Sequence, residues 1–191
     1  MKIGLLGGTF NPIHIGHLAM GQVALENLSL DKVVYIPANI PPHKRSSVIA
    51  SARDRFEMVK LAIKDNPKFE VSDIELKRGG KSYTVDTVKT FHTQYPDGTK
   101  FYFIVGGDLA ETLPSWKNID ELRKLVSFVA LNRPGFKIKQ SKYRIKSITM
   151  PALEISSTFL RQCFSSGGSA KYLLQQRVVD YIQKHKLYGV K

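Results

Sequence analysis

The length of the chain, 191 residues, suits one domain with a substantial core and leaves no room for two independent catalytic domains. We therefore expect a single domain over residues 1–191. Hydrophobic residues make up 42% of the sequence and are spread evenly, which argues against disorder outside short loops. The formal net charge of +13 suits a phosphate-bearing partner, either a nucleic acid or a small charged substrate. Because the charges are dispersed and no basic strand carries interleaved aromatic residues, the sequence argues against a nucleic acid.

Three features of the sequence bear on the compartment. No apolar stretch approaches the length that spans a bilayer, so no membrane partner is expected. The first apolar residues are interrupted by Gly7, Gly8 and Pro12 before a signal-peptide core can form. Cys163 is the only cysteine, which excludes an internal disulfide. Together these features predict a cytoplasmic protein.

Short apolar runs rich in Val, Ile, Phe and Leu recur along the chain and are typical of buried parallel strands. We predict strands at residues 2–6, 32–37, 69–76, 101–105, 126–131 and 147–150. Apolar residues at helical spacing lie between several of these runs. We predict helices at residues 16–28, 51–64 and 84–95.

The alternation of strands and helices predicts an α/β fold. We expect a Rossmann-like, doubly wound, mainly parallel sheet with helices on both faces. Ligands of such sheets lie at the carboxyl ends of the strands, where the chain direction switches. The loop at residues 38–50, rich in Pro, Lys and Ser, is the best candidate for a flap over that crevice.

Residues 7–17, which read Gly-Gly-Thr-Phe-Asn-Pro-Ile-His-Ile-Gly-His, follow the first predicted strand and lead into a helix. Glycines let the backbone approach an anion, and a helix N-terminus offers free N–H groups and the positive end of its dipole. If the helix begins near Ile13, His14 and His17 share one face and can bind neighbouring oxygens of one polyphosphate. We therefore predict a phosphate site here and call residues 7–17 the phosphate loop.

A second phosphate signal lies near the C-terminus, at residues 154–161, Glu-Ile-Ser-Ser-Thr-Phe-Leu-Arg. Ser156 or Ser157 is a natural N-cap, and the helix that follows would present N–H groups, hydroxyls and the guanidinium of Arg161. The same pattern is equally typical of an ordinary capped helix.

Together the two motifs resemble those of the nucleotidyltransferase superfamily. The string His14-Ile15-Gly16-His17 is also similar to a motif of class I aminoacyl-tRNA synthetases, but those enzymes need additional anticodon-recognising modules. Four further segments, in chain order, are similar to bacterial nicotinate-nucleotide adenylyltransferases: Pro41-Pro42-His43-Lys44, residues 82–87 (Ser-Tyr-Thr-Val-Asp-Thr), Gly106-Gly107-Asp108 with Trp116-Lys117, and Tyr181-Ile182 through Leu187-Tyr188. Two positions depart from that family: Asn11, where many relatives have Asp, and Gly107, where Ala is usual.

The resemblance implies a reaction in which the 5′-phosphate of nicotinate mononucleotide attacks the α-phosphorus of ATP. The products are nicotinate adenine dinucleotide and pyrophosphate. Because the attacking phosphate is already anionic, no general base or covalent nucleophile is required, and positioning with charge stabilisation must supply the catalysis. Mg²⁺ is expected to bridge phosphate oxygens while keeping its waters, so no protein metal ligand is predicted. A zinc site on His14 and His17 lacks an evident third ligand.

The resemblance also implies roles for individual residues. The expected catalytic residues are His14 and His17 at the α- and β-phosphates, with Lys44 and Arg161 near the departing pyrophosphate and the β- and γ-phosphates. The residues expected to bind ATP are Gly8, Thr9, Phe10, His14, His17, Gly106, Asp108, Ser156, Ser157, Thr158 and Arg161. Those expected to bind the mononucleotide are Thr84, Trp116, Lys44 and Asp108.

Three of these residues are expected to set acceptor specificity and orientation. The indole of Trp116 would stack on the pyridine ring. The backbone N–H of Thr84 would favour the nicotinate carboxylate over an amide, and Asp108 would accept a hydrogen bond from a ribose hydroxyl.

Two rival functions stay open from the sequence, since fold alone does not fix the acceptor. One is a small adenylyltransferase that uses phosphopantetheine, and the other is a basic RNA-binding protein on a nucleotide fold. A homo-oligomer is compatible with the sequence.

Overall fold

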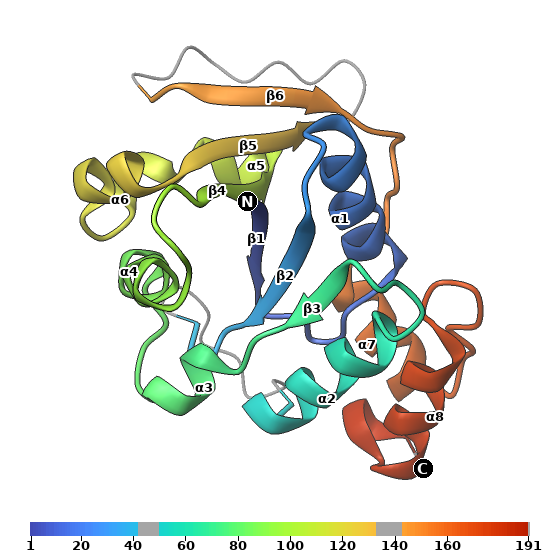
Figure 1. The fold of residues 1–191 in the computed structure, drawn as a ribbon. Coiled ribbons are helices and arrows are strands. Elements are labelled where there is room, and N and C mark those ends of the chain that lie inside the picture. Colours follow the sequence, from blue (N-terminus) through green and yellow to red (C-terminus); the bar gives the residue numbers. More distant parts are fainter. Residues whose placement is uncertain (42–49, 133–142, 191) are drawn as a thin grey trace.

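A six-stranded sheet forms the centre of the protein, for which a computed structural model describes residues 1–41, 50–132 and 143–190 (Figure 1). Its strands lie in the order β3-β2-β1-β4-β5-β6, and every neighbouring pair is parallel. The strands are β1 (Lys2–Gly8), β2 (Lys32–Pro37), β3 (Phe69–Val71), β4 (Lys100–Gly106), β5 (Ser127–Asn132) and β6 (Ile145–Thr149). The predicted Rossmann-like α/β class is confirmed.

Helices cover both faces of the sheet, as predicted (Figure 1). One face is covered by α1 (Ile15–Asn27), α2 (Ala52–Ala62), α7 (Ser157–Ser165) and α8 (Gln176–Lys184). The other face is covered by α3 (Ile74–Arg78), α4 (Thr84–Gln94), α6 (Ile119–Leu125) and the 3₁₀ turn η1 (Leu113–Ser115). Two short elements remain: α5 (Gly107–Ala110), which follows β4 directly, and the 3₁₀ turn η2 (Leu187–Gly189) at the C-terminus.

The core follows the alternation of side chains along the strands. In β1, Ile3 and Leu5 join the buried cluster beneath α4 and α6, whereas Leu6 joins the cluster beneath α1. In β4, Phe103 and Ile104 divide between the same two clusters. A strand with apolar residues on both faces reads as a continuous apolar run, and for this reason the strands could be found in the sequence.

The predicted strand at 69–76 is wrong in its second half. The strand β3 ends at Val71, and Ile74 begins the helix α3. Ser72 and Asp73 turn the chain, because the Ser72 hydroxyl accepts from the Ile74 N–H and the Asp73 carbonyl accepts from the Lys77 N–H. Such residues favour helix starts over strand interiors. Of the predicted flap at 38–50, residues 42–49 lie outside the described residues.

Chain order reverses at the centre of the sheet. The strand β1 has β2 on one side and β4 on the other, so the connections leave in opposite directions from the carboxyl ends of β1 and β4. A crevice is expected at this point. No helix in the described part of the chain is both long and apolar enough to cross a bilayer.

Candidate active site

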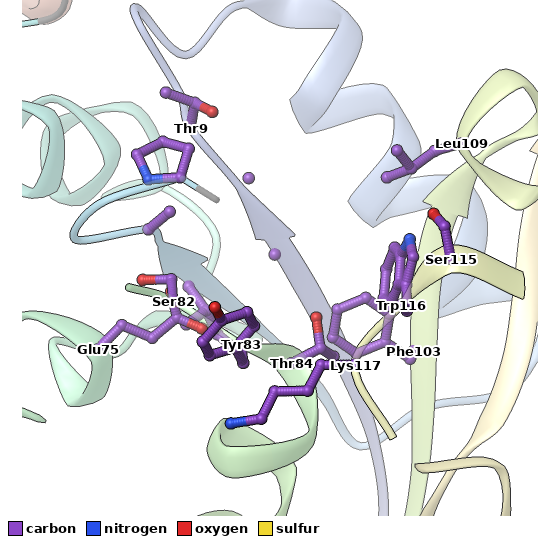
Figure 2. Close-up of a pocket in the computed structure, with 15 residues that line it drawn as sticks. Thr9, Glu75, Ser82, Tyr83, Thr84, Phe103, Leu109, Ser115, Trp116 and Lys117 are labelled. Carbon is purple, nitrogen blue, oxygen red and sulfur yellow. The ribbon is translucent and has the colours of Figure 1, made fainter. Parts of the chain in front are cut away.

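Two cavities open at the carboxyl ends of β1 and β4. The first, of about 370 Å³, is lined by Gly8, Thr9, Thr84, Phe103 and Trp116, and we call it the tryptophan pocket (Figure 2). The second, of about 240 Å³, has both polar and apolar lining residues, and we call it the histidine pocket. Its lining includes His14, His17, Gly106, Asp108, Leu131, Met150, Leu153 and Ile155. Both pockets take residues from the phosphate loop and from the segment after β4, so both lie at the same edge of the sheet.

The two histidines of the phosphate loop come together as predicted. The helix α1 begins at Ile15 rather than near Ile13, with His14 as its N-cap, and the ring centroids of His14 and His17 lie 3.8 Å apart. The His14 backbone N–H donates to Nδ1 of His17 over 3.3 Å. Since Nδ1 is the acceptor, a neutral His17 ring carries its proton on Nε2.

His14 is held as a neutral imidazole. Burial lowers the pKa of its ring from 6.5 to about 4, and its Nδ1 is a buried atom with no hydrogen-bond partner in the described residues. The ring lies against Gly16, where a Cβ atom would come within 3.0 Å of Nδ1. A side chain at position 16 would therefore force the His14 ring to shift by a few tenths of an ångström.

Phe10 supports His17 from the core side. It is 2% exposed and has a positive φ of 49°, and its ring meets that of His17 edge-on at 5.1 Å. A Cβ atom at Gly8 would lie 2.9 Å from the Phe10 ring, so only glycine lets the ring pack there. The hydroxyl of Tyr35 donates to the His17 carbonyl at 3.3 Å. Phe10 can contribute only its backbone to a ligand, because its side chain belongs to the core.

The second phosphate motif joins the first across the molecule. Ser156 caps α7 by accepting from the Phe159 N–H at 3.1 Å, as its sequence pattern predicts. Ser157 Oγ donates to the carbonyl of Pro12 at 2.9 Å. Arg161 donates through Nη1 to the carbonyl of Asn11 at 2.9 Å, and through Nη2 to Oγ1 of Thr158 at 3.2 Å. The Ser157 hydroxyl and the Arg161 guanidinium thus hold the phosphate loop itself.

The tryptophan pocket is built from aromatic edges and a helix N-terminus. Trp116 is half-buried, meets Phe103 edge-on at 5.7 Å, and donates through Nε1 to Oγ1 of Thr112 at 3.3 Å (Figure 2). Thr84 is the first residue of α4, so its backbone N–H has no partner within the helix. Thr84 and Trp116, two of the four residues predicted to bind the mononucleotide, therefore line one cavity.

Of the other two residues predicted to bind the mononucleotide, only Asp108 lies within the described residues. Asp108 is exposed and lines the histidine pocket, whereas its neighbour Leu109 lines the tryptophan pocket. Lys44, with Pro42 and His43, lies outside the described residues.

Arg55 is a site-supporting residue that was missed at the sequence level. It is 1% exposed and donates to three main-chain carbonyls: Ala50 at 3.1 Å, Thr9 at 2.9 Å and Asn39 at 2.9 Å. Burial lowers the pKa of its guanidinium. A signal was present, because Arg55 stands three residues before Met58 on the buried face of the helix.

Glu75 was also missed, because it lies in the segment predicted as strand. Its buried carboxylate lines the tryptophan pocket and accepts from Oγ1 of Thr87 at 2.6 Å. Thr87 in turn accepts from Nη2 of Arg78 at 3.0 Å. These bonds join α3 to the first turn of α4, and so position the N-terminus at Thr84.

The parallel 3-2-1-4-5-6 sheet, with a glycine-rich loop and paired histidines at the carboxyl edge of β1, defines an α/β nucleotidyltransferase. Residues 5–163 match the family model described as Cytidylyltransferase-like. The chain is 48% identical over 187 residues to a protein of Lactococcus lactis, covering 98% of this chain and 95% of that protein. It is 45% identical over 190 residues to a protein of Listeria innocua, covering 100% and 98%. Both carry the name "Probable nicotinate-nucleotide adenylyltransferase". The chain belongs to the nicotinate-nucleotide adenylyltransferase family.

Solved structures agree with the fold. The structure of Plasmodium falciparum nicotinic acid mononucleotide adenylyltransferase complexed with NaAD matches with a TM-score of 0.82 at 24% identity, covering 100% of this chain and 98% of that one. The same protein complexed with APC matches with a TM-score of 0.80. At this identity the match bears on the architecture alone.

Proposed function

We propose that this protein transfers the adenylyl group of ATP to nicotinate mononucleotide, forming nicotinate adenine dinucleotide and pyrophosphate in NAD biosynthesis. The observation that carries the proposal is the pair of pockets that share the phosphate loop and the segment after β4. Two nucleotides bound in these pockets would bring their phosphates to one place, which is what a group transfer between them needs. The family to which the chain belongs supports the same reaction.

The histidine pocket is assigned to ATP. Its apolar residues Leu131, Met150 and Ile155 suit the adenine ring, and Asp108 can accept a hydrogen bond from a ribose hydroxyl. The phosphates would lie against His14 and His17 at the start of α1. The N-terminus of α7 at Ser156, Ser157 and Thr158 would approach the β- and γ-phosphates, because this helix is hydrogen-bonded to the phosphate loop.

The tryptophan pocket is assigned to nicotinate mononucleotide. The indole of Trp116 offers a surface for the pyridine ring. The free N–H of Thr84 at the start of α4 would donate to the carboxylate, whereas an amide NH₂ would meet it as a second donor. This difference is the proposed basis for choosing the acid over the amide.

Catalysis would depend on preorganised donors. The attacking phosphate needs no base, and negative charge develops on the oxygens of the α-phosphoryl group and on the departing pyrophosphate. His17 offers Nε2–H to that charge, since its Nδ1 is occupied by the His14 N–H. His14 would act as a neutral donor throughout the physiological pH range, because burial lowers its pKa to about 4. Lys44 is proposed to stabilise the pyrophosphate.

Mg²⁺ is proposed as the metal cofactor. Among the described residues no group of three or more His, Cys, Asp or Glu side chains could hold a metal ion. Asp108 is the carboxylate that the histidine pocket offers to metal-bound water, while Asn11 Oδ1 is buried and already accepts two hydrogen bonds. These residues fit a Mg²⁺ that binds chiefly phosphate oxygens and water and supplies charge neutralisation. We place the reaction in the cytoplasm, where a free thiol such as Cys163 stays reduced.

The test is the release of pyrophosphate from ATP and Mg²⁺ by the purified protein. Nicotinate mononucleotide, nicotinamide mononucleotide and phosphopantetheine are offered separately as acceptors. We expect strong preference for the first. Pyrophosphate release with phosphopantetheine alone would support the ATP site but refute nicotinate mononucleotide as the acceptor. Silence with all three, together with RNA binding that weakens steeply with salt, would refute the enzyme and favour a binding protein.

A further inference from the structure

The C-terminal turn of the chain reaches back to the phosphate loop. The hydroxyl of Tyr188, in η2, donates to Oδ1 of Asn11 at 2.9 Å, although the two residues are 177 positions apart in the sequence. Both side chains are buried, with 9% of Tyr188 and 5% of Asn11 exposed. Neither residue lines the histidine pocket. The bond therefore acts beside the site and not in it.

Asn11 is a junction between separate segments. Its Oδ1 also accepts from the backbone N–H of Ala50 at 3.0 Å, and its carbonyl accepts from Arg161 at 2.9 Å. Asn11 follows Phe10, whose φ is positive, and precedes Pro12, whose carbonyl accepts from Ser157. Fixing the side chain of Asn11 thus fixes the turn that leads to the two histidines.

Tyr188 is itself held firmly. Its φ of 60° is in the left-handed region, which a residue with a side chain adopts at a cost unless its surroundings fix it. Its ring stacks on Phe164 of α7 with centroids 6.4 Å apart. Burial raises the pKa of its hydroxyl well above the usual range. The hydroxyl is therefore a neutral donor over the whole pH range in which the protein is expected to work.

We propose that Tyr188 is a positioning residue for ATP: its hydroxyl orients Asn11, and through Asn11 the phosphate loop that carries His14 and His17. The role rests on the proposed function. It accounts for the Leu187-Tyr188 segment, which the site left unexplained. It also accounts for an amide at position 11, because only the oxygen of that side chain is needed by Tyr188 and Ala50, and an amide and a carboxylate both supply it.

The test is the substitution Tyr188→Phe, which keeps the ring and removes the hydroxyl. Loss of one buried hydrogen bond is worth about 1 kcal/mol, or about fivefold in affinity. We expect the KM for ATP to rise about fivefold, while the KM for the mononucleotide stays within twofold. An unchanged KM for ATP, or an equal rise in both KM values, would overturn the proposal.

A matched control lies on the same C-terminal segment. The hydroxyl of Tyr181, in α8, donates to Oδ1 of Asp54 in α2 at 2.9 Å, so Tyr181→Phe also removes one tertiary hydrogen bond. No hydrogen bond that the described residues give Tyr181 reaches the phosphate loop. We expect this variant to lose a comparable amount of stability with no change in the KM for ATP. If Tyr181→Phe raises that KM as much as Tyr188→Phe does, the effect is general loosening and the positioning role is wrong.

A double-mutant cycle checks that Tyr188 acts through Asn11. ATP binding is measured by calorimetry without any acceptor, so the result does not depend on which acceptor the enzyme uses. We expect Tyr188→Phe to weaken ATP binding about fivefold in the wild-type background. The same loss is expected in the Asn11→Asp background, where the acceptor oxygen is kept. In Asn11→Ala it should cause no further loss. If the losses of ATP affinity from Tyr188→Phe and Asn11→Ala are fully additive, the inference is overturned. If ATP binds normally but nicotinate mononucleotide gives no turnover, only the proposed function is refuted.

Discussion

The histidine pocket and the tryptophan pocket differ in how their polar groups are held. On the histidine side, the phosphate loop is tied by bonds from Ser157, Arg161 and Tyr188, which come from distant parts of the sequence. On the tryptophan side, aromatic edges form part of the wall, and the start of α4 is positioned by bonds among Glu75, Thr87 and Arg78, which lie close together in the sequence. Donors that are fixed in advance need no reorganisation when charge develops. From this comparison we propose that catalysis belongs to the first pocket and recognition to the second.

Arg55 supports the phosphate loop, which contributes residues to both pockets, because it joins the Thr9 carbonyl to those of Asn39 and Ala50. The substitution Arg55→Met leaves three carbonyls without their donors, and we expect the free energy of unfolding to fall by about 4 kcal/mol. Urea denaturation measures it. The control is Arg53→Met, which removes an exposed pair with Glu57 and should change stability by less than about 1 kcal/mol. Equal losses in the two variants would mean that Arg55 does not hold the loops.

The buried state of His14 makes stability depend on pH. Its folded-state pKa of about 4 lies below the unfolded value of 6.5, so between these values the unfolded chain binds more protons. The free energy of unfolding should therefore fall as pH drops from 6.5 to 4, by about 3 kcal/mol for this group. Denaturation of the wild type and of His14→Gln at a series of pH values isolates the contribution. Parallel curves would show that His14 is not buried as a neutral ring.

His17→Ala removes a preorganised donor from the histidine pocket. We expect normal folding and a loss of about a hundredfold or more in kcat, as for removal of one donor from a charge-stabilising site. Steady-state rates with saturating ATP measure the change in kcat. His185→Ala, at the exposed end of α8, is the control and should keep the wild-type kcat. Near-normal turnover in His17→Ala would take His17 out of the mechanism.

Trp116→Ala tests the recognition side. Loss of the stacking surface should raise the KM for the mononucleotide about tenfold and leave the KM for ATP unchanged. Initial rates with each substrate varied in turn separate the two constants. Tyr172→Ala, which truncates an aromatic ring that is 79% exposed, should change neither. A rise in the KM for ATP instead would reverse the assignment of the two pockets.

Local signals made the histidine side predictable. The glycine-rich loop and the three-residue spacing of His14 and His17 predict a phosphate site at a helix start, and the N-cap role of Ser156 follows from the residue type. These features depend on residues close in the sequence. On the tryptophan side, the grouping of Thr84 with Trp116 came only from the resemblance, because nothing local links two residues on separate elements.

Long-range contacts account for what was missed. The bonds from Arg55 to Thr9 and from Tyr188 to Asn11 exist only after the sheet has formed, and no spacing rule predicts them. The bond from Ser157 to Pro12 is also a long-range contact that no spacing rule predicts. The Ser157 hydroxyl was expected at the phosphates, and it donates to the Pro12 carbonyl. At residues 69–76 the apolar run hid a helix start, because burial gives strands and short helices the same composition.

The most direct test of the two-pocket assignment is a crystal structure with the product, nicotinate adenine dinucleotide, bound. We expect the pyridine ring against Trp116 with its carboxylate at the Thr84 N–H, the adenine against Leu131 and Met150, and the bridging phosphates at the phosphate loop. A dinucleotide bound in the opposite orientation, or bound outside these two pockets, would contradict the division between catalysis and recognition.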